Sequence, residues 1–435
     1  MREYIKRTKK QKTETAKTTR TPTEALGTAR LLERPWLGRV GDVDPFDAFP
    51  IRMEAYMMNL LDFYSTAGSQ ALYLIESQTA YDPIKSYWLP LAFGHAALLH
   101  SVIACAAAIA SGSFHDRLAV FHLNAAIRLL NRDLEGTSSR ATSDANIAVV
   151  CTVAMIEENT GYHQNWRIHM KGLRELVQLR GGLNAFISSP LILNKIQRAD
   201  LCGCIETGER LYFSDDFSKF PHPHIGLDCG LSKALQTVIC PNDRMTSLIA
   251  RLAHTVQSLN QLCEGDDTIN PTAVRTALTF LQYDMLSLEC DSILSKMLRT
   301  ALLQLLWTIA EKLPHKSAFG TGSNVLQLRI KSLIEQTQNE HIYCNDDGFN
   351  NFQLWVLLLA GCSTSNNPPL KNWYLSSIQS LGLSMDLCGR DWADVKGRVQ
   401  SFFWVPRLYG NAFEMVWNEA NCFEKHATVL PLLPK

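Results

Sequence analysis

The sequence has no excess of charge of either sign, because its 435 residues carry 42 basic and 42 acidic side chains. The whole molecule therefore has no net field that would attract nucleic acid or an anionic membrane. A local excess lies at the start, where eight basic residues face two acidic residues within positions 1–20. A charged partner of the chain after position 20 must therefore be bound by a local patch of the opposite charge.

Cysteine is missing from the first 104 residues, and the twelve cysteines of the chain begin at Cys105 with no regular spacing. A binuclear zinc cluster needs six closely spaced cysteine thiolates, so these 104 residues contain no DNA-binding motif of that kind. No signal peptide precedes the cysteines. We therefore expect free thiols in a reducing compartment rather than disulfides.

The common catalytic motifs are missing as well. The sequence contains no Gly-x-Ser-x-Gly, no phosphate loop with Gly-Lys-Ser/Thr and no His-Glu-x-x-His. A helical terpene synthase is an alternative, because such enzymes use acidic pairs to bind magnesium and a diphosphate. The three acidic pairs lack a further aspartate one helical turn later and stand beside loop-forming residues: Asp215-Asp216, Asp266-Asp267 and Asp346-Asp347.

A zinc site is a second alternative. The densest set of soft ligands is Cys202, Cys204, His222, His224, Cys229 and Cys240. Cys202 and Cys204 belong to a predicted helix, and residues two apart on a helix point about 200° apart, which is unsuitable for one ion. We therefore favour buried small residues over ligands, and we expect no catalytic residue, no cofactor, no metal and no enzyme activity.

Long hydrophobic runs are few, and one of them is the segment 88–110, which contains no Asp, Glu, Lys or Arg. Its length is that of a membrane span. Pro90, Gly94, His95 and His100 interrupt it, which favours a buried core helix that begins near His95. We predict no membrane segment.

Sustained alternation of apolar and polar residues is absent, which argues against a substantial sheet. Helical periodicity is frequent instead. It predicts a helix over 116–131 with Phe121 on its apolar stripe, and a second helix that begins at a cap formed by Ser143 or Asp144. A third helix is predicted from Asn165 to the glycine pair Gly181-Gly182. Two further helices are predicted over 298–313 and 352–360. The predicted fold class is all-α, a compact irregular multi-helical bundle.

The composition also predicts the domain organisation. Residues 1–40 are rich in Lys, Arg and Thr and have no apolar period, so we predict a disordered basic N-terminal arm. Residues 41–435 form the helical domain. A sub-boundary is predicted at 213–230, where prolines, glycines and acids occur without periodicity.

Two groups of basic residues are candidate binding sites. The run KRTKKQK suits nuclear import or phosphate contact, or is a solvated end, through Lys6, Arg7, Lys9, Lys10 and Lys12. A cationic helix face, formed by Arg167, Lys171 and Arg174, suits a phosphate or an acidic partner, or is a solvated face.

Several segments, taken in order, resemble one large family. They are DPFDAFPI at 44–51, WLPLAFGHAALLHSVIACAAA at 88–108, HLNAAIRLLN at 122–131, SDANIAVVCTVAMIE at 143–157, NWRIHMKGLRELVQLRGGL at 165–183, ADLCGCIETGERLYF at 199–213 and FFWVPRLYGNAFEMVW at 402–417. They are similar to the core helices of the fungal-specific transcription factor domain family, of the tachykinin-like type. The similarity extends from about 44 to about 420.

The resemblance implies a nuclear regulatory protein whose helical domain modulates transcription. Its expected partners are proteins of transcription, a second copy in a homodimer, or a small-molecule effector. Many relatives carry an N-terminal zinc cluster that this sequence lacks, so direct contact with DNA stays open. The alternative is an interaction or ligand-sensing protein derived from such a factor, and a helical enzyme is the third hypothesis.

Overall fold

The structure is a computed structural model that describes residues 48–68, 72–73, 75–76, 81–217, 243–311, 324–340, 347–364, 367–387 and 390–422. Within these ranges the regular secondary structure is helical and no strand occurs. The all-α fold class is therefore confirmed. The predicted basic arm lies outside the described residues, as does most of the predicted sub-boundary at 213–230, and both stay predictions.

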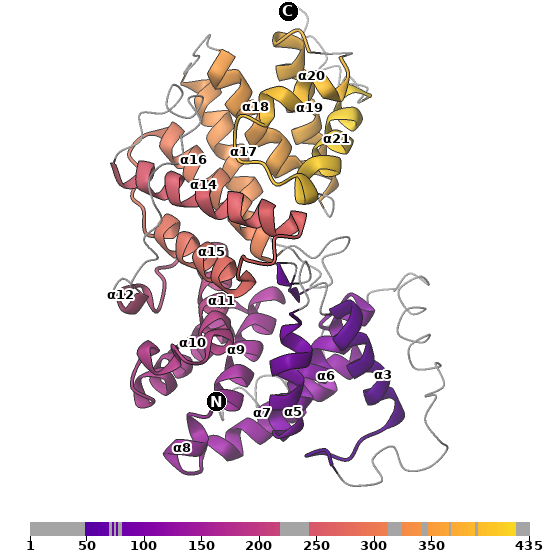
Figure 1. The fold of residues 1–435 in the computed structure, drawn as a ribbon, viewed down its shortest axis with the longest axis vertical. Helices are drawn as coiled ribbons and strands as arrows, with labels where there is room; N and C mark the ends of the chain where they lie inside the picture. Colours follow the sequence, from indigo (N-terminus) through magenta and orange to yellow (C-terminus); the bar gives the residue numbers. More distant parts are fainter. Residues whose placement is uncertain are drawn as a thin grey trace, which may run out of the picture.

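The helices gather in two halves along the long axis of the molecule (Figure 1). The N-terminal half contains α3 (Ala55–Phe63), η1 (Tyr64–Gly68), η3 (Ile84–Trp88), α5 (Leu89–Phe93), α6 (Ala96–Ser111), α7 (Arg117–Leu134), α8 (Ser138–Ala141), α9 (Asp144–Asn159), α10 (His163–Leu179), η4 (Leu183–Phe186), α11 (Pro190–Thr207) and α12 (Ser214–Phe217). Its buried apolar side chains form one cluster, which runs from Met53 to Phe213 and includes Phe280 and Tyr283 of the other half.

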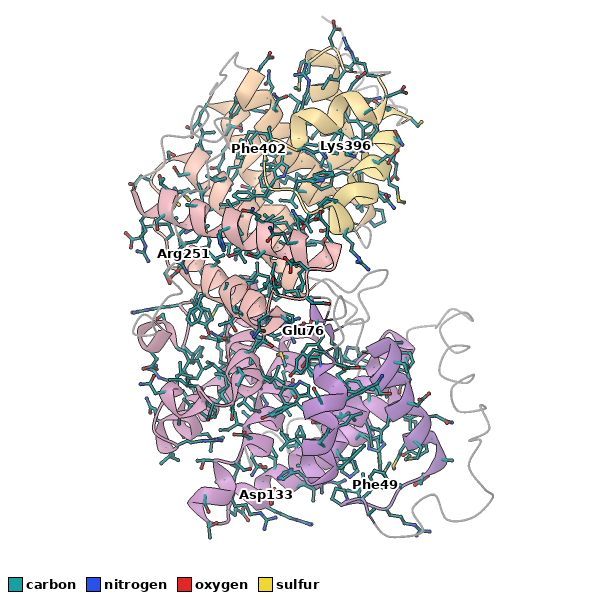
Figure 2. The ribbon with its side chains drawn as sticks, in the orientation of Figure 1. Phe49, Glu76, Asp133, Arg251, Lys396 and Phe402 are labelled. Carbon is teal, nitrogen blue, oxygen red and sulfur yellow. The ribbon has the colours of Figure 1, made fainter. Side chains whose placement is uncertain are left out.

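The C-terminal half contains α14 (Asp243–Glu264), α15 (Pro271–Leu286), α16 (Ile293–Glu311), α17 (Val325–Asn339), α18 (Asp347–Gly361), α19 (Pro368–Ser384), α20 (Trp392–Val399) and α21 (Pro406–Asn421). A second apolar cluster fills it, and this cluster takes in Ile75 and Ile205 from the N-terminal half. Figure 2 shows side chains filling the spaces between helices in both halves, with Glu76 between the two. Each half thus has a core of its own.

Local sequence signals account for several helix boundaries. The Ser143 side chain accepts a hydrogen bond from the Asn146 amide at the start of α9, as predicted. Helix α10 ends before Gly181, whose φ of 108° belongs to the left-handed region that glycine adopts most easily. The prediction that Phe121 lies on the buried apolar stripe of α7 is wrong, since this side chain is 54% exposed. The side of α7 that is buried, where it packs against α6, instead carries alanines, His122, Ile127 and Leu130.

The long stretch without charges forms the buried helix α6. His95 is its N-cap and accepts a hydrogen bond from the Leu98 amide at 3.4 Å, as the predicted start near His95 requires. Across the described ranges, no helix is both long and apolar enough to cross a membrane.

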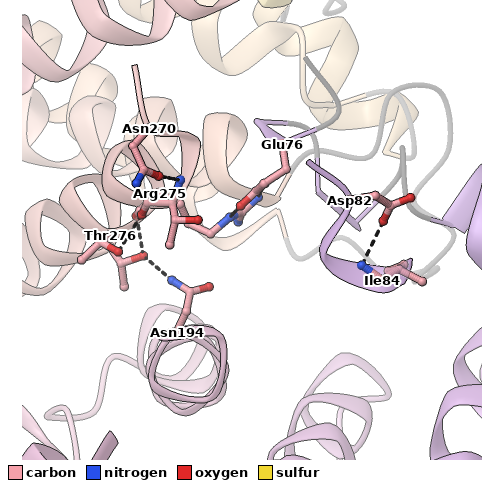
Figure 3. A network of polar contacts seen from close by, with 9 residues as sticks. Glu76, Asp82, Ile84, Asn194, Asn270, Arg275 and Thr276 are labelled. Carbon is pink, nitrogen blue, oxygen red and sulfur yellow. Dashed lines mark hydrogen bonds and ion pairs between the residues drawn. The ribbon is translucent and has the colours of Figure 1, made fainter. Parts of the chain in front are cut away.

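Polar contacts join the two halves where α11 meets α15. Arg275 of α15 forms a buried ion pair with Glu76 of the N-terminal half, and Figure 3 shows the two side chains meeting. The Asn194 amide of α11 donates to the Thr279 hydroxyl of α15 at 3.1 Å. We call this set of contacts the seam. Apolar side chains also cross between the halves, since Phe280 belongs to the N-terminal core and Ile205 to the C-terminal core.

Candidate functional site

Helix α10 is held against α11 by its buried side. Trp166, Met170, Leu173 and Val177 are almost completely inaccessible to solvent, as the apolar stripe predicted. The Trp166 indole donates a hydrogen bond from Nε1 to the Ala199 carbonyl of α11 at 2.9 Å. A Cβ atom at Gly203 would lie 2.0 Å from the Trp166 ring, so this close approach needs glycine.

The opposite side of α10 carries the three predicted cations, Arg167, Lys171 and Arg174, and the structure brings them together along one edge of the helix. Arg167 is engaged, because its Nε donates to the Glu209 carboxylate at 2.6 Å. Lys171 and Arg174 are exposed, and neither forms an ion pair with any residue in the described ranges. Two of the three charges therefore stay available for a partner.

Beside this edge lies an open groove of about 370 Å³. Arg174 of α10 forms one wall, and the segment that follows α11 forms the other. The lining residues are Arg174, Glu209, Arg210, Leu211, Tyr212 and Ser214. Glu209 is paired with Arg167, and Arg210 also has an interaction partner within the chain. Of the charged lining residues, Arg174 is the one that forms no ion pair in the described ranges.

A buried carboxylate fixes the second wall of the groove. Asp200 of α11 accepts hydrogen bonds from the backbone amides of Tyr212 at 3.0 Å and Phe213 at 3.1 Å. Burial raises the pKa of Asp200 to about 6, and these hydrogen bonds hold it lower than burial alone would. The Tyr212 ring packs edge-on against Trp166, with the ring centroids 5.6 Å apart. The groove is thus preorganised by the packing of α10 on α11.

A family profile described as the fungal-specific transcription factor domain matches residues 59–390, which is most of the chain. The chain belongs to this family. The match includes α10, α11 and every residue that lines the groove. No curated protein and no solved structure matches the chain. The family assignment that the ordered segments suggested is confirmed, while the family itself assigns no role to the groove.

The other predicted basic group cannot be placed beside this site. Lys6, Arg7, Lys9, Lys10 and Lys12 lie outside the described residues. Their role in nuclear import or phosphate contact stays a prediction.

The soft-ligand set is only partly described. Cys202 and Cys204 lie on α11, where the Cys202 thiol donates to the Ala199 carbonyl and the Cys204 thiol to the Asp200 carboxylate. Burial raises the pKa of the Cys204 thiol, which keeps it protonated. The remaining members lie outside the described residues, and no group of three metal-ligating side chains converges in the described ranges.

The acidic pairs fall on three separate elements. Asp216 belongs to α12, Asp266 and Asp267 follow α14, and Asp347 is the first residue of α18. Asp266 is engaged locally, because its carboxylate accepts hydrogen bonds from the amide and hydroxyl of Thr268. Asp346 lies outside the described residues.

Buried histidines form a second polar cluster in the N-terminal half. His122 of α7 lies with its Nδ1 2.8 Å from Nδ1 of His100 and its Nε2 3.1 Å from the Tyr56 hydroxyl. Burial, and to a smaller extent the adjacent His100, lower the pKa of His122 to about 4. His122 is therefore a neutral, hydrogen-bonded core residue at neutral pH.

Reasoning from the sequence missed one wall of the groove. Arg210, Tyr212 and Ser214 follow the end of α11 and show no periodicity that would mark them. A weak signal existed, since 199–213 is among the family-like segments and Asp200 stands there among the small and apolar residues of ADLCGCI. A buried aspartate requires hydrogen-bond donors, and here they come from the wall of the groove.

Proposed function

We propose that this chain is a nuclear regulator of fungal transcription that acts without catalysis, through contacts made by its helical domain. Membership of the fungal-specific transcription factor domain family carries the proposal. The groove beside α10 supports it, because the groove is a preorganised surface within the matched family domain and exposes Arg174, which forms no ion pair in the described ranges. Protein partners are the first expectation, and a homodimer or a small-molecule effector would use the same domain.

The helical domain, rather than a zinc cluster, is the active part in this proposal. The first cysteine is Cys105, so no thiolate in residues 1–104 can bind zinc. Recruitment to promoters would then come from partner proteins bound by the domain, with weak phosphate contact from the basic run at 6–12 as an addition.

Location and chromatin occupancy test the proposal together. The tagged full chain is expected in the nucleus and enriched at defined promoters, and alanine at Lys6, Arg7, Lys9, Lys10 and Lys12 is expected to reduce nuclear entry. An exclusively cytosolic chain, or an occupancy profile identical to that of an untagged strain, would overturn the proposal. A nuclear chain without promoter enrichment would favour the second candidate, an interaction protein that no longer regulates genes, for which the groove is the supporting observation.

A further inference from the structure

The outermost face of α10 carries two apolar and two charged side chains in one row. Successive residues of a helix are rotated by about 100°, which places four side chains within an arc of about 80°: Ile168, Lys171, Glu175 and Leu179. The arc lies opposite the side of the helix that packs into the core. We call these four side chains the outer row.

The outer row is exposed on the described part of the chain. Ile168 and Leu179 are 52% and 69% exposed. The side chains of Lys171 and Glu175 are also exposed, and neither forms an ion pair within the described ranges. They stand one helical turn apart, but a lysine that precedes a glutamate pairs less well within a helix than the reverse order. The row thus offers apolar surface and two unpaired charges to a partner.

The charges of the row cancel, and this separates the classes of partner. The evenly spaced phosphates of a nucleic acid would meet the carboxylate of Glu175 as well as the ammonium group of Lys171. A protein surface that places one anion and one cation at the matching spacing satisfies both groups. The row therefore favours a protein over a nucleic acid.

The order of the row matches its own reverse. Read from either end, it runs from an apolar residue through two opposite charges to a second apolar residue. In an antiparallel pair of α10 helices with a twofold axis near residues 173–174, Ile168 faces Leu179 of the second copy, and Lys171 faces Glu175 of the second copy. A twofold interface repeats each contact. The pair would therefore contain two apolar contacts and two ion pairs.

We propose that the outer row of α10 is a self-association surface, through which two copies of this chain pair by antiparallel α10 helices. The row complements its own reversed image in apolar positions and in charge, and this identifies the occupant as a second copy. One helix pair is a small interface, so the dimer is expected to be weak and to depend on protein concentration. The inference deepens the proposed function by naming a partner, and rests on it for its role in the cell.

Two single charge reversals test the pairing with little risk to the fold, because both residues are exposed. Lys171→Glu leaves only carboxylates in the row and Glu175→Lys leaves only ammonium groups, so like charges face each other in either homodimer. Each variant alone is expected to dimerise about tenfold or more weakly than the wild type. An equimolar mixture of the two variants is expected to form a heterodimer, because the carboxylates of one copy then face the ammonium groups of the other.

The measurement is sedimentation equilibrium of the purified full chain at low salt, over a series of concentrations. Lys396→Glu is the matched control, since it makes the same change of charge at an exposed lysine of α20, which Figure 2 shows in the C-terminal half. It is expected to weaken the dimer by less than about twofold, because a charge outside the interface counts less than a facing pair. Ile168→Ser is expected to weaken the dimer, and mixing it with the wild type is expected to restore less association than the charge-reversed mixture shows.

Three results would overturn the inference: a wild-type chain that sediments as a monomer at every concentration, a dimer that the charge reversals in the row weaken no more than Lys396→Glu does, or a mixture of the two reversals that stays monomeric. The measurement is independent of promoter occupancy. A dimer with the expected charge dependence, in a chain without promoter enrichment, would leave the inference standing while the proposed function fails. Promoter enrichment of a chain that stays monomeric would do the reverse.

Discussion

The Tyr283 hydroxyl of α15 donates a hydrogen bond to Oδ2 of Asp200 on α11 at 2.9 Å, and the same oxygen accepts the Phe213 amide. One buried carboxylate therefore joins the wall of the groove to the C-terminal half. This contact lies on the same two helices, α11 and α15, as the seam contact between Asn194 and Thr279.

Substitutions at Asp200 and Tyr283 separate the hydrogen bond that this carboxylate accepts from α15 from the bonds that it accepts from the groove wall. Tyr283→Phe removes one hydrogen bond and is expected to lower the free energy of unfolding by about 1 kcal/mol. Asp200→Asn replaces one carboxylate oxygen by an NH₂ group and leaves one of the two backbone amides of the wall without an acceptor, so it is expected to cost about 2 to 3 kcal/mol. Urea unfolding measures both. Equal losses would mean that the bonds to Tyr212 and Phe213 contribute little.

The ion pair of Glu76 and Arg275 is buried on both sides, with the two side chains 0% and 3% exposed. Arg275→Met removes the positive charge that faces the buried Glu76 carboxylate and is expected to cost about 3 to 5 kcal/mol. Adding Glu76→Leu removes that carboxylate, so the double variant is expected to be more stable than Arg275→Met alone.

A double-mutant cycle monitored by urea unfolding checks this expectation. The partly exposed pair of Arg251 and Asp284 is the control, since solvent screens it more, and Arg251→Met is expected to cost less than Arg275→Met. Additive losses at Glu76 and Arg275 would contradict the interpretation.

The packing of α10 on α11 gives a steric prediction with an internal control. In Gly203→Ala the new methyl group would overlap the rigid Trp166 ring, and the free energy of unfolding is expected to fall by about 3 kcal/mol or more. In Gly172→Ala, on α10 itself, the methyl group meets nothing within 4 Å. That variant is expected to gain about 0.5 to 1 kcal/mol through helix propensity. The melting temperatures of the two variants should shift in opposite directions from that of the wild type. A shift in the same direction would contradict the packing of Gly203 against Trp166.

Glu158 gives a pH prediction. Burial, and to a smaller extent the adjacent Glu206, raise its pKa from an ordinary value of 4.5 to about 8. Between pH 4.5 and 8 the folded chain binds a proton that the unfolded chain releases, so the stability of the fold is lost as the pH rises through this window. Each pKa unit corresponds to about 1.4 kcal/mol.

Glu158→Gln removes this linkage. The variant is expected to exceed the wild type in melting temperature by little at pH 5 and by more at pH 8, measured by differential scanning fluorimetry. A gain of equal size at both values would show that the carboxyl is not protonated in the fold.

Much of the local structure was predictable because it depends on short-range chemistry. Ser143 capped α9, Gly181 followed the end of α10, and the stripe of Trp166 and Leu173 was buried as its spacing indicated. Phe121 shows the limit of this reasoning. Its spacing fits an apolar stripe, but which side of α7 is covered depends on the neighbouring helix α6, and the sequence around Phe121 does not specify that neighbour.

The sequence by itself determined the helices, the cationic edge of α10 and, through ordered segments, the family. The tertiary structure alone decided that Glu209 neutralises Arg167 while Arg174 turns to the groove, and that Glu76 meets a partner 199 residues away. The physical reason is the distance along the sequence over which each kind of interaction acts. Caps and periodicity act over one or two helical turns, whereas ion pairs and groove walls form between segments that only the packed chain brings together.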